Sequence, residues 1–158
     1  MWRAYFSHMA SSIAPLEPLG HAHRYATVLL GLRKTGALSL AAAVRNGLAY
    51  RALDRFARET ELPLGALGEL IQIPSRTLVR RKTEGRLQPE ESDRLLRASR
   101  IFGLAIDLFE GDRVAALHWL SSAQHALGNE TPMALIQTDV GAREVENLIG
   151  RLEHGVAV

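Results

Sequence analysis

A run of basic residues lies between residues 75 and 86, where the chain reads Ser-Arg-Thr-Leu-Val-Arg-Arg-Lys-Thr-Glu-Gly-Arg. Guanidinium groups bind phosphate oxygens, and they also pair with the O6 and N7 atoms of guanine. This composition therefore predicts contact with a nucleic acid, at its backbone, its base edges or both. The candidate DNA-binding residues are Ser75, Arg76, Thr77, Arg80, Arg81, Lys82 and Arg86.

Helical spacing, at about 100° per residue, separates the side chains of residues 75–84 into two arcs. One arc holds Arg76, Thr77, Arg80, Arg81 and Glu84. The other holds Ser75, Leu78, Val79 and Lys82. We expect the helix to pack through Leu78 and Val79 and to present three arginines outward, which suits entry into a DNA major groove. The alternative is a solvated basic helix without a ligand.

A shorter helical segment precedes the basic helix after a tight break. It places Leu67, Leu70 and Ile71 on one side, and the break falls at residues 72–74 because Pro74 disfavours helix for the residue before it. We expect Gln72 to keep a negative φ angle in this turn. Ser75 is expected to cap the second helix, which ends at Gly85. The pattern predicts a helix-turn-helix.

The charge of the chain is distributed unevenly. Residues 74–86 hold five Lys or Arg and one acid, whereas residues 87–158 hold six Lys or Arg and eleven acids. A polyanion is therefore attracted to one part of the chain and repelled by another. No apolar run is long enough to span a bilayer, and the absence of cysteine excludes disulfides and fits a cytoplasmic location.

The remaining elements are also expected to be helices, and no strand pattern competes with them. The ranges are 39–46, 50–60, a long helix that opens at Leu87-Gln-Pro-Glu-Glu, 112–120, 131–136 and 140–154. We expect an all-α chain with an amino-terminal arm that can be flexible (1–37), a helix-turn-helix DNA-binding and dimerisation domain (38–110) and a small helical domain (111–158).

Two of these helices carry apolar stripes. The stripe on the long helix predicts either a core or a dimer seam, and it comprises Leu95, Ile101, Phe102, Ala105, Leu108 and Phe109. The last helix has a candidate buried face of Ala142, Val145, Leu148, Ile149 and Leu152.

Three separated segments resemble the Xre/MbcA/ParS group of type II antitoxins. They are Leu87 to Arg97, Ala126 to Leu135, and Thr138 to Gly155, and a helix-turn-helix lies upstream of them. The resemblance implies a homodimer that binds operator DNA, represses its own operon and neutralises a RES-domain toxin that degrades NAD⁺, by covering the active site of that toxin. It places the toxin-binding residues on the polar face of the last helix: Arg143, Glu146, Asn147, Gly150, Arg151 and His154.

The sequence favours a binding protein over an enzyme. His118 and His125 flank Ser121 and Ser122, but no acid or oxyanion-type glycine turn accompanies them, and no phosphate-binding loop or dinucleotide motif is present. We expect no cofactor, and no metal site at His21-Ala-His23. The competing function is that of a stand-alone helix-turn-helix regulator whose terminal domain senses a small molecule.

Overall fold

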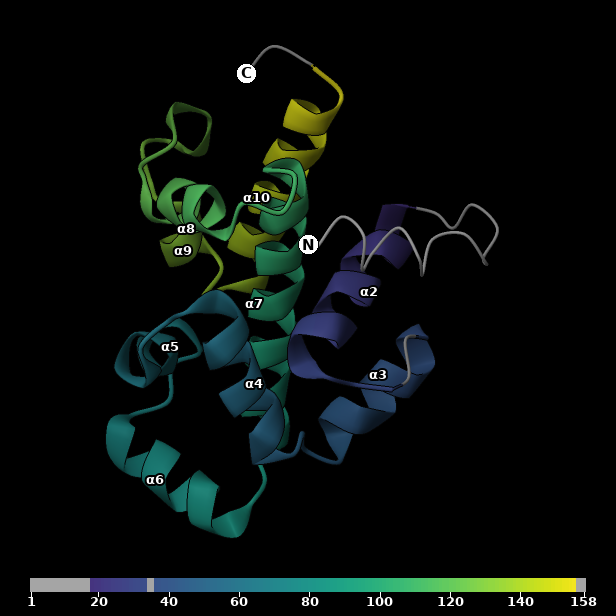
Figure 1. Cartoon of the computed structure of the whole chain (residues 1–158), viewed down its shortest axis with the longest axis vertical. Coiled ribbons are helices and arrows are strands. Elements are labelled where there is room, and N and C mark those ends of the chain that lie inside the picture. The colour runs from purple at the N-terminus through teal and green to yellow at the C-terminus, as the bar shows by residue number, and fades with distance from the viewer. Residues whose placement is uncertain (1–17, 34–35, 156–158) are drawn as a thin grey trace.

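The computed structural model describes residues 18–33 and 36–155, and these residues form helices joined by short loops (Figure 1). The described part of the chain holds no β-strand, only the isolated bridges Ala49–Arg86 and Gln124–Glu130. The expected all-α class is confirmed. The elements are α2 (Pro18–Leu30), α3 (Ala37–Arg45), α4 (Tyr50–Thr60), α5 (Leu64–Leu70), α6 (Ser75–Glu84), α7 (Pro89–Leu108), α8 (Arg113–Ser121), the 3-10 helix η1 (His125–Leu127), α9 (Pro132–Leu135) and α10 (Asp139–Glu153).

The long helix α7 forms the axis of the molecule. Its start is defined by a capping box, in which the Gln88 side chain and the Glu91 side chain each bind the other residue's backbone, with Pro89 in the first turn. Helices α2, α3, α4, α8 and α10 pack against α7. Figure 1 shows α6 beyond one end of this axis and the carboxyl end of α10 beyond the other.

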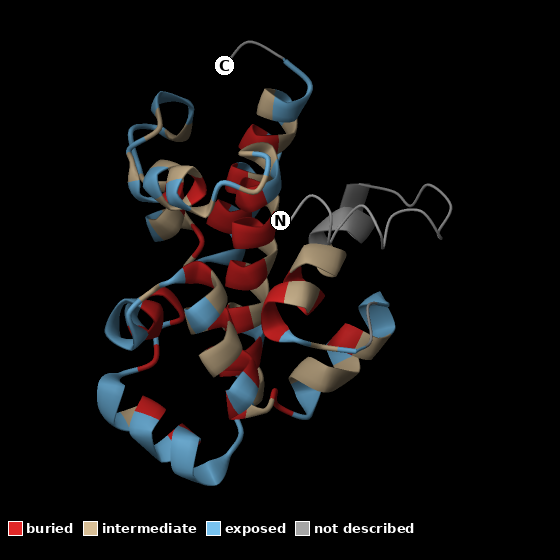
Figure 2. Ribbon diagram, in the orientation of Figure 1, coloured by how far each residue is buried: buried red, intermediate tan, exposed pale blue. Residues whose placement is uncertain are grey.

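The apolar stripe of α7 lies in the core of this single chain. Leu95, Ile101, Phe102 and Ala105 are at most 2% exposed, so the choice between a core and a dimer seam is decided for these four residues in favour of the core. Figure 2 shows the buried residues concentrated along α7 and the facing side of α10.

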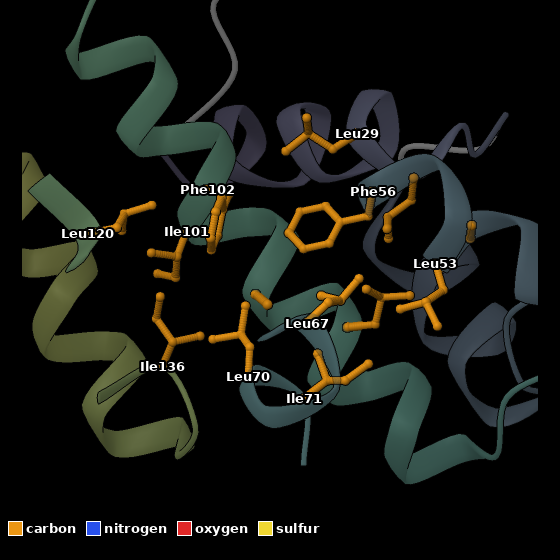
Figure 3. Close-up of a cluster of buried hydrophobic side chains, with 14 of the residues drawn as sticks. Leu29, Leu53, Phe56, Leu67, Leu70, Ile71, Ile101, Phe102, Leu120 and Ile136 are labelled. Carbon is orange, nitrogen blue, oxygen red and sulfur yellow. The ribbon is translucent and has the colours of Figure 1, made fainter. Parts of the chain in front are cut away.

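The core joins segments that are distant in sequence (Figure 3). Phe56 of α4 meets Phe102 of α7 edge to face, with ring centroids 5.2 Å apart. Leu29 of α2 borders the same cluster, and Leu120 and Ile136 extend it toward the carboxyl end. Both predicted domains therefore share one continuous apolar interior.

Residues 18–33 do not form the expected arm, because most of this range is helix α2, which packs on α7. It buries Ala26, Leu29 and Leu30, and it lies so close to α7 that a Cβ on Gly103 would stand 2.1 Å from the Cβ of Tyr25. Pro18 occupies the first helical position, where proline is tolerated because no intrahelical partner is needed there. Residues 1–17 of the expected arm lie outside the described residues.

Side-chain capping confirms the predicted starts of two later helices. Asp112 accepts a hydrogen bond from the Ala115 amide (3.0 Å), and Thr131 accepts one from the Ala134 amide (3.2 Å). Helix α3 begins after Gly36, earlier than the predicted start at residue 39. None of the helices in the described ranges is long and apolar enough to cross a membrane.

Candidate functional site

Helices α5 and α6 form the predicted helix-turn-helix. Gln72 adopts a φ of +55°, so the expectation of a negative angle was wrong. The Arg94 guanidinium of α7 holds this turn by donating to the carbonyl oxygens of Ile71 (3.1 Å) and Gln72 (2.9 Å). The turn thus reverses the chain through a left-handed residue, and contacts from outside the motif stabilise that residue.

Gly68 provides the close approach of the two helices. A Cβ at this position would lie 2.8 Å from Leu78 Cδ1 and 2.9 Å from the Ile73 carbonyl oxygen. The backbone of α5 therefore contacts both the turn and the buried face of α6. The close approach thus depends on a glycine within the first helix, a position that the sequence pattern alone did not single out.

The face that α6 presents to solvent differs from the predicted one. Its buried residues are Leu78 and Arg81, whereas Val79 is 68% exposed. The expectations that Val79 packs inward and Arg81 points outward were both wrong. Residues three apart lie on the same side of a helix, so Arg81 is buried together with Leu78. Ser75 does not cap α6, because the N-cap position belongs to Pro74.

Arg81 instead fastens α6 to the first turn of α7. Its Nε donates to both carboxylate oxygens of Glu91, at 3.0 and 2.8 Å, and its Nη1 donates to Glu84 Oε2 at 2.7 Å. Burial would raise the pKa of the Glu91 carboxyl, but the hydrogen bonds from Arg81 and from the Gln88 amide outweigh it and hold that pKa below its ordinary value. The bonds from Glu91 and Glu84 raise the pKa of Arg81. Arg81 therefore positions the helix and leaves the set of candidate DNA contacts.

The outer face of α6 keeps its other basic residues. Arg76 and Lys82 are exposed and make no ion pair within the described part of the chain, and Arg80 approaches only Glu84, at 3.8 Å. Ser75 is also exposed, and Thr77 is half-buried. Figure 2 shows most of α6 as exposed ribbon. These residues form what we call the basic face of α6: Ser75, Arg76, Thr77, Arg80 and Lys82.

Arg86 contributes charge next to the basic face but also has a structural role. Its Nη1 donates to the carbonyl oxygens of Asn46 (2.9 Å) and Gly47 (2.8 Å), which precede α4. These bonds join the end of the helix-turn-helix to the loop between α3 and α4. Gly47 follows the C-cap residue of α3 and has a φ of +78°.

The second candidate surface is the outer side of α10. Its inner side is as predicted, because Ala142, Val145, Leu148 and Ile149 are at most 1% exposed and Leu152 is half-buried. Four of the six predicted toxin-binding residues are exposed: Arg143, Asn147, Arg151 and His154. Gly150 is half-buried, and a Cβ there would meet nothing within 4 Å, so this point of the helix is open to an approaching chain. We call these five residues the outer face of α10.

Glu146 is the exception on α10. Its carboxylate pairs with Nε of Arg100 on α7, and the two side chains are only 21% and 22% exposed. His23 of α2 lies near this pair, where burial and the Arg100 charge lower its pKa against the opposing effect of Glu146. Glu146 thus belongs to the contact between α10 and α7, and it is no longer a candidate for contact with the toxin.

The Ser122 hydroxyl, next to the end of α8, is bonded to the backbone of that helix. The Ser122 hydroxyl donates to the His118 carbonyl oxygen (2.7 Å), one helical turn earlier, and the His118 and His125 side chains are exposed. Among the residues that the structure describes, no group of three or more His, Asp or Glu side chains is placed to hold a metal ion.

Two known families match consecutive parts of the chain. Residues 39–100 match the antitoxin Xre-like helix-turn-helix domain, and residues 104–155 match the antitoxin Xre/MbcA/ParS C-terminal toxin-binding domain. The boundary between the two matches falls inside α7.

Curated relatives extend the similarity over most of the chain. The antitoxin Xre of Yersinia enterocolitica is 39% identical over 128 residues, which are 80% of this chain and 86% of the relative. The antitoxin Xre of Photorhabdus laumondii is 32% identical over the same shares. The antitoxin Xre of Pseudomonas putida is 34% identical over 84 residues, 52% of each chain. The chain therefore belongs to the Xre family of antitoxins, with an Xre-like helix-turn-helix domain followed by a C-terminal toxin-binding domain.

Proposed function

We propose that this chain neutralises a RES-domain toxin that degrades NAD⁺, by laying the outer face of α10 over the toxin's active-site cleft. As a homodimer in the cytoplasm, it also represses its own operon through the basic face of α6. The match of residues 104–155 to a toxin-binding domain favours this function over that of a ligand-sensing regulator.

The observation that carries the proposal is the separation of two outward surfaces along α7. The basic face of α6 is attached near Glu91, at the amino end of α7, and the outer face of α10 is attached near Arg100, further along it. Figure 1 shows α6 and the end of α10 at opposite ends of the molecule. One chain can therefore bind DNA and a protein at the same time.

Charge supports DNA as the partner of α6. Arg76, Arg80 and Lys82 are exposed on a helix whose outer side is nearly free of acids, since Glu84 lies at its carboxyl end. Arginines near the start of a recognition helix meet base edges, and the others contact phosphates. A dimer reads two half-sites when its recognition helices stand about 34–36 Å apart, one turn of DNA.

The DNA-binding part is tested with the double substitution Arg76→Ala and Arg80→Ala. In a mobility-shift titration with duplex from upstream of the gene, we expect operator binding to be abolished, because exposed guanidinium contacts are lost without disturbing the core. Growth rescue against the toxin should remain. Arg143→Ala with Arg151→Ala removes the same charge from α10 and serves as the control. Unchanged operator affinity in the Arg76/Arg80 variant would contradict the proposal.

The toxin-binding part is tested by enlarging Gly150. Gly150→Gln adds a side chain into open space on a helix that tolerates glutamine well, so folding should be retained while the approach of the toxin is blocked. We expect loss of growth rescue with normal operator binding. Gly65→Gln fills a comparably open position on α5 and should keep full rescue. Rescue by both variants would refute the assignment of α10.

The nature of the toxin is tested separately, with the purified product of the neighbouring gene. We expect that protein to consume NAD⁺ and to stop when the wild-type chain is added in equal amount. A bound partner without NAD⁺ consumption would contradict the RES assignment alone and leave the antitoxin function intact.

A further inference from the structure

Val79 is an apolar side chain at the middle of the basic face of α6. It is the fifth of ten helical residues and 68% exposed. Arg76 stands one turn before it and Arg80 follows it directly, and both are exposed. Val79 therefore lies within the surface that the proposed function assigns to DNA.

The position is unusual for its residue type. Valine is a weak helix former, and an exposed valine gains little from packing. Other exposed apolar side chains, Leu38, Leu64, Val114 and Val140, are scattered singly over other helices, and such residues need no explanation. Val79 differs because basic side chains flank it on a recognition helix, so its neighbours fix the chemistry of the partner as a polyanion.

The DNA major groove offers one apolar feature to such a side chain. The C5-methyl group of thymine projects into the groove, whereas the other groups there are hydrogen-bond donors and acceptors. We propose that Val79 contacts a thymine methyl group in each operator half-site and makes the protein select thymine at that position. This inference rests on the proposed DNA-binding function, and it specifies one base that the protein recognises.

The surrounding contacts are consistent with an apolar reader at this point. The Thr83 hydroxyl, one turn after Val79, donates back to the Val79 carbonyl oxygen at 3.3 Å, so its hydrogen is used within the helix. The arginines at 76 and 80 then supply the contacts to guanine or phosphate on either side. The expected half-site contains a thymine beside the base pair that an arginine reads.

The experiment uses the full chain and a duplex that the wild-type protein selects from a randomised pool. Each thymine of the selected duplex is replaced in turn by deoxyuridine, which lacks the methyl group and keeps every hydrogen-bonding group. Dissociation constants are measured at one fixed salt concentration, because phosphate contacts make affinity salt-dependent. We expect uracil at one position per half-site to weaken wild-type binding about fourfold, the equivalent of one buried carbon.

The Val79→Ala variant identifies the side chain that senses the methyl group. Because Val79 is exposed, this substitution should leave folding unchanged, and we expect the variant to bind thymine and uracil duplexes with equal affinity. Val114→Ala, at a 76% exposed position on α8, is the matched control and should keep the wild-type response.

The outcomes separate this inference from the proposed function. Selective binding with no uracil-sensitive position, or with the same sensitivity in Val79→Ala, overturns the role of Val79 and leaves DNA binding intact. Failure of the wild-type chain to select any duplex overturns both.

Discussion

Helix α7 holds α6 and α10 by different kinds of contact. Helix α6 buries Leu78 and the aliphatic stem of Arg81, and its link to α7 is an ion pair whose side chains are 9% and 10% exposed. Helix α10 buries Ala142, Val145, Leu148 and Ile149, and its ion pair to α7 is more than twice as exposed. Helix α6 therefore depends on directional polar bonds, and helix α10 depends on apolar packing.

This difference predicts different sensitivities to substitution. Apolar burial is non-directional and scales with area, so it stabilises the whole chain. A buried ion pair adds little net free energy, but loss of one partner leaves a desolvated charge and is strongly destabilising. The orientation of α6 should thus be specific and easily lost, whereas that of α10 should persist until the core itself unfolds.

The largest effect is expected for Ile149→Ala on α10. Ile149 is 1% exposed in the shared core, so the substitution should lower the free energy of unfolding by about 4 kcal/mol through lost burial and a cavity. Denaturant unfolding followed by circular dichroism measures it. Because the core is continuous, we expect operator binding and toxin binding to be lost in one transition, and two separate transitions would contradict a shared core.

Glu91→Gln should have the next largest effect. It keeps the size of the side chain but removes the charge that pairs with Arg81, and we expect a loss of about 3 kcal/mol in unfolding free energy. Operator affinity should fall while toxin binding persists under conditions where the variant is folded. Glu90→Gln, at the exposed neighbouring position, should cost no more than about 0.5 kcal/mol. Equal losses in the two variants would show that burial of Glu91 is unimportant.

The pH dependence of stability tests the same ion pair without changing its shape. The pKa of Glu91 is lower in the folded chain than in the unfolded chain, so its contribution is fully present above the unfolded value of about 4.3 and is lost as pH falls through the folded value. As the pH falls below about 4.3, we expect the stability of the wild-type chain to fall more steeply than that of Glu91→Gln. Parallel curves from thermal unfolding at several pH values would refute the assignment.

The smallest effect is expected at the ion pair between α7 and α10. Arg100→Gln and Glu146→Gln should each lower the unfolding free energy by no more than about 1 kcal/mol, because both side chains are about one-fifth exposed and solvent screens their attraction. A double-mutant cycle in urea gives the coupling. A coupling as large as that between Arg81 and Glu91 would remove the contrast between the two helices.

The sequence alone determined most of the helices and several of their ends. Proline, glycine and capping side chains act on their near neighbours, and for this reason Asp112, Thr131 and Gly85 marked helix boundaries correctly. The inner face of α10 was predicted because five apolar residues fill one side and leave no competing arrangement. The family of the chain was also identified from the sequence, because its motifs are recognised by residue type and order alone.

Only the tertiary structure decided which way α6 faces. Helical periodicity gives the angle between two side chains on one helix, but the direction of the core comes from other elements, here α5 at Gly68 and α7 at Glu91. A charge such as that of Arg81 is buried when a partner distant in sequence compensates it, and no local pattern contains that partner. The same reason explains helix α2, which is stabilised by packing on α7, and the left-handed Gln72, which is stabilised by Arg94.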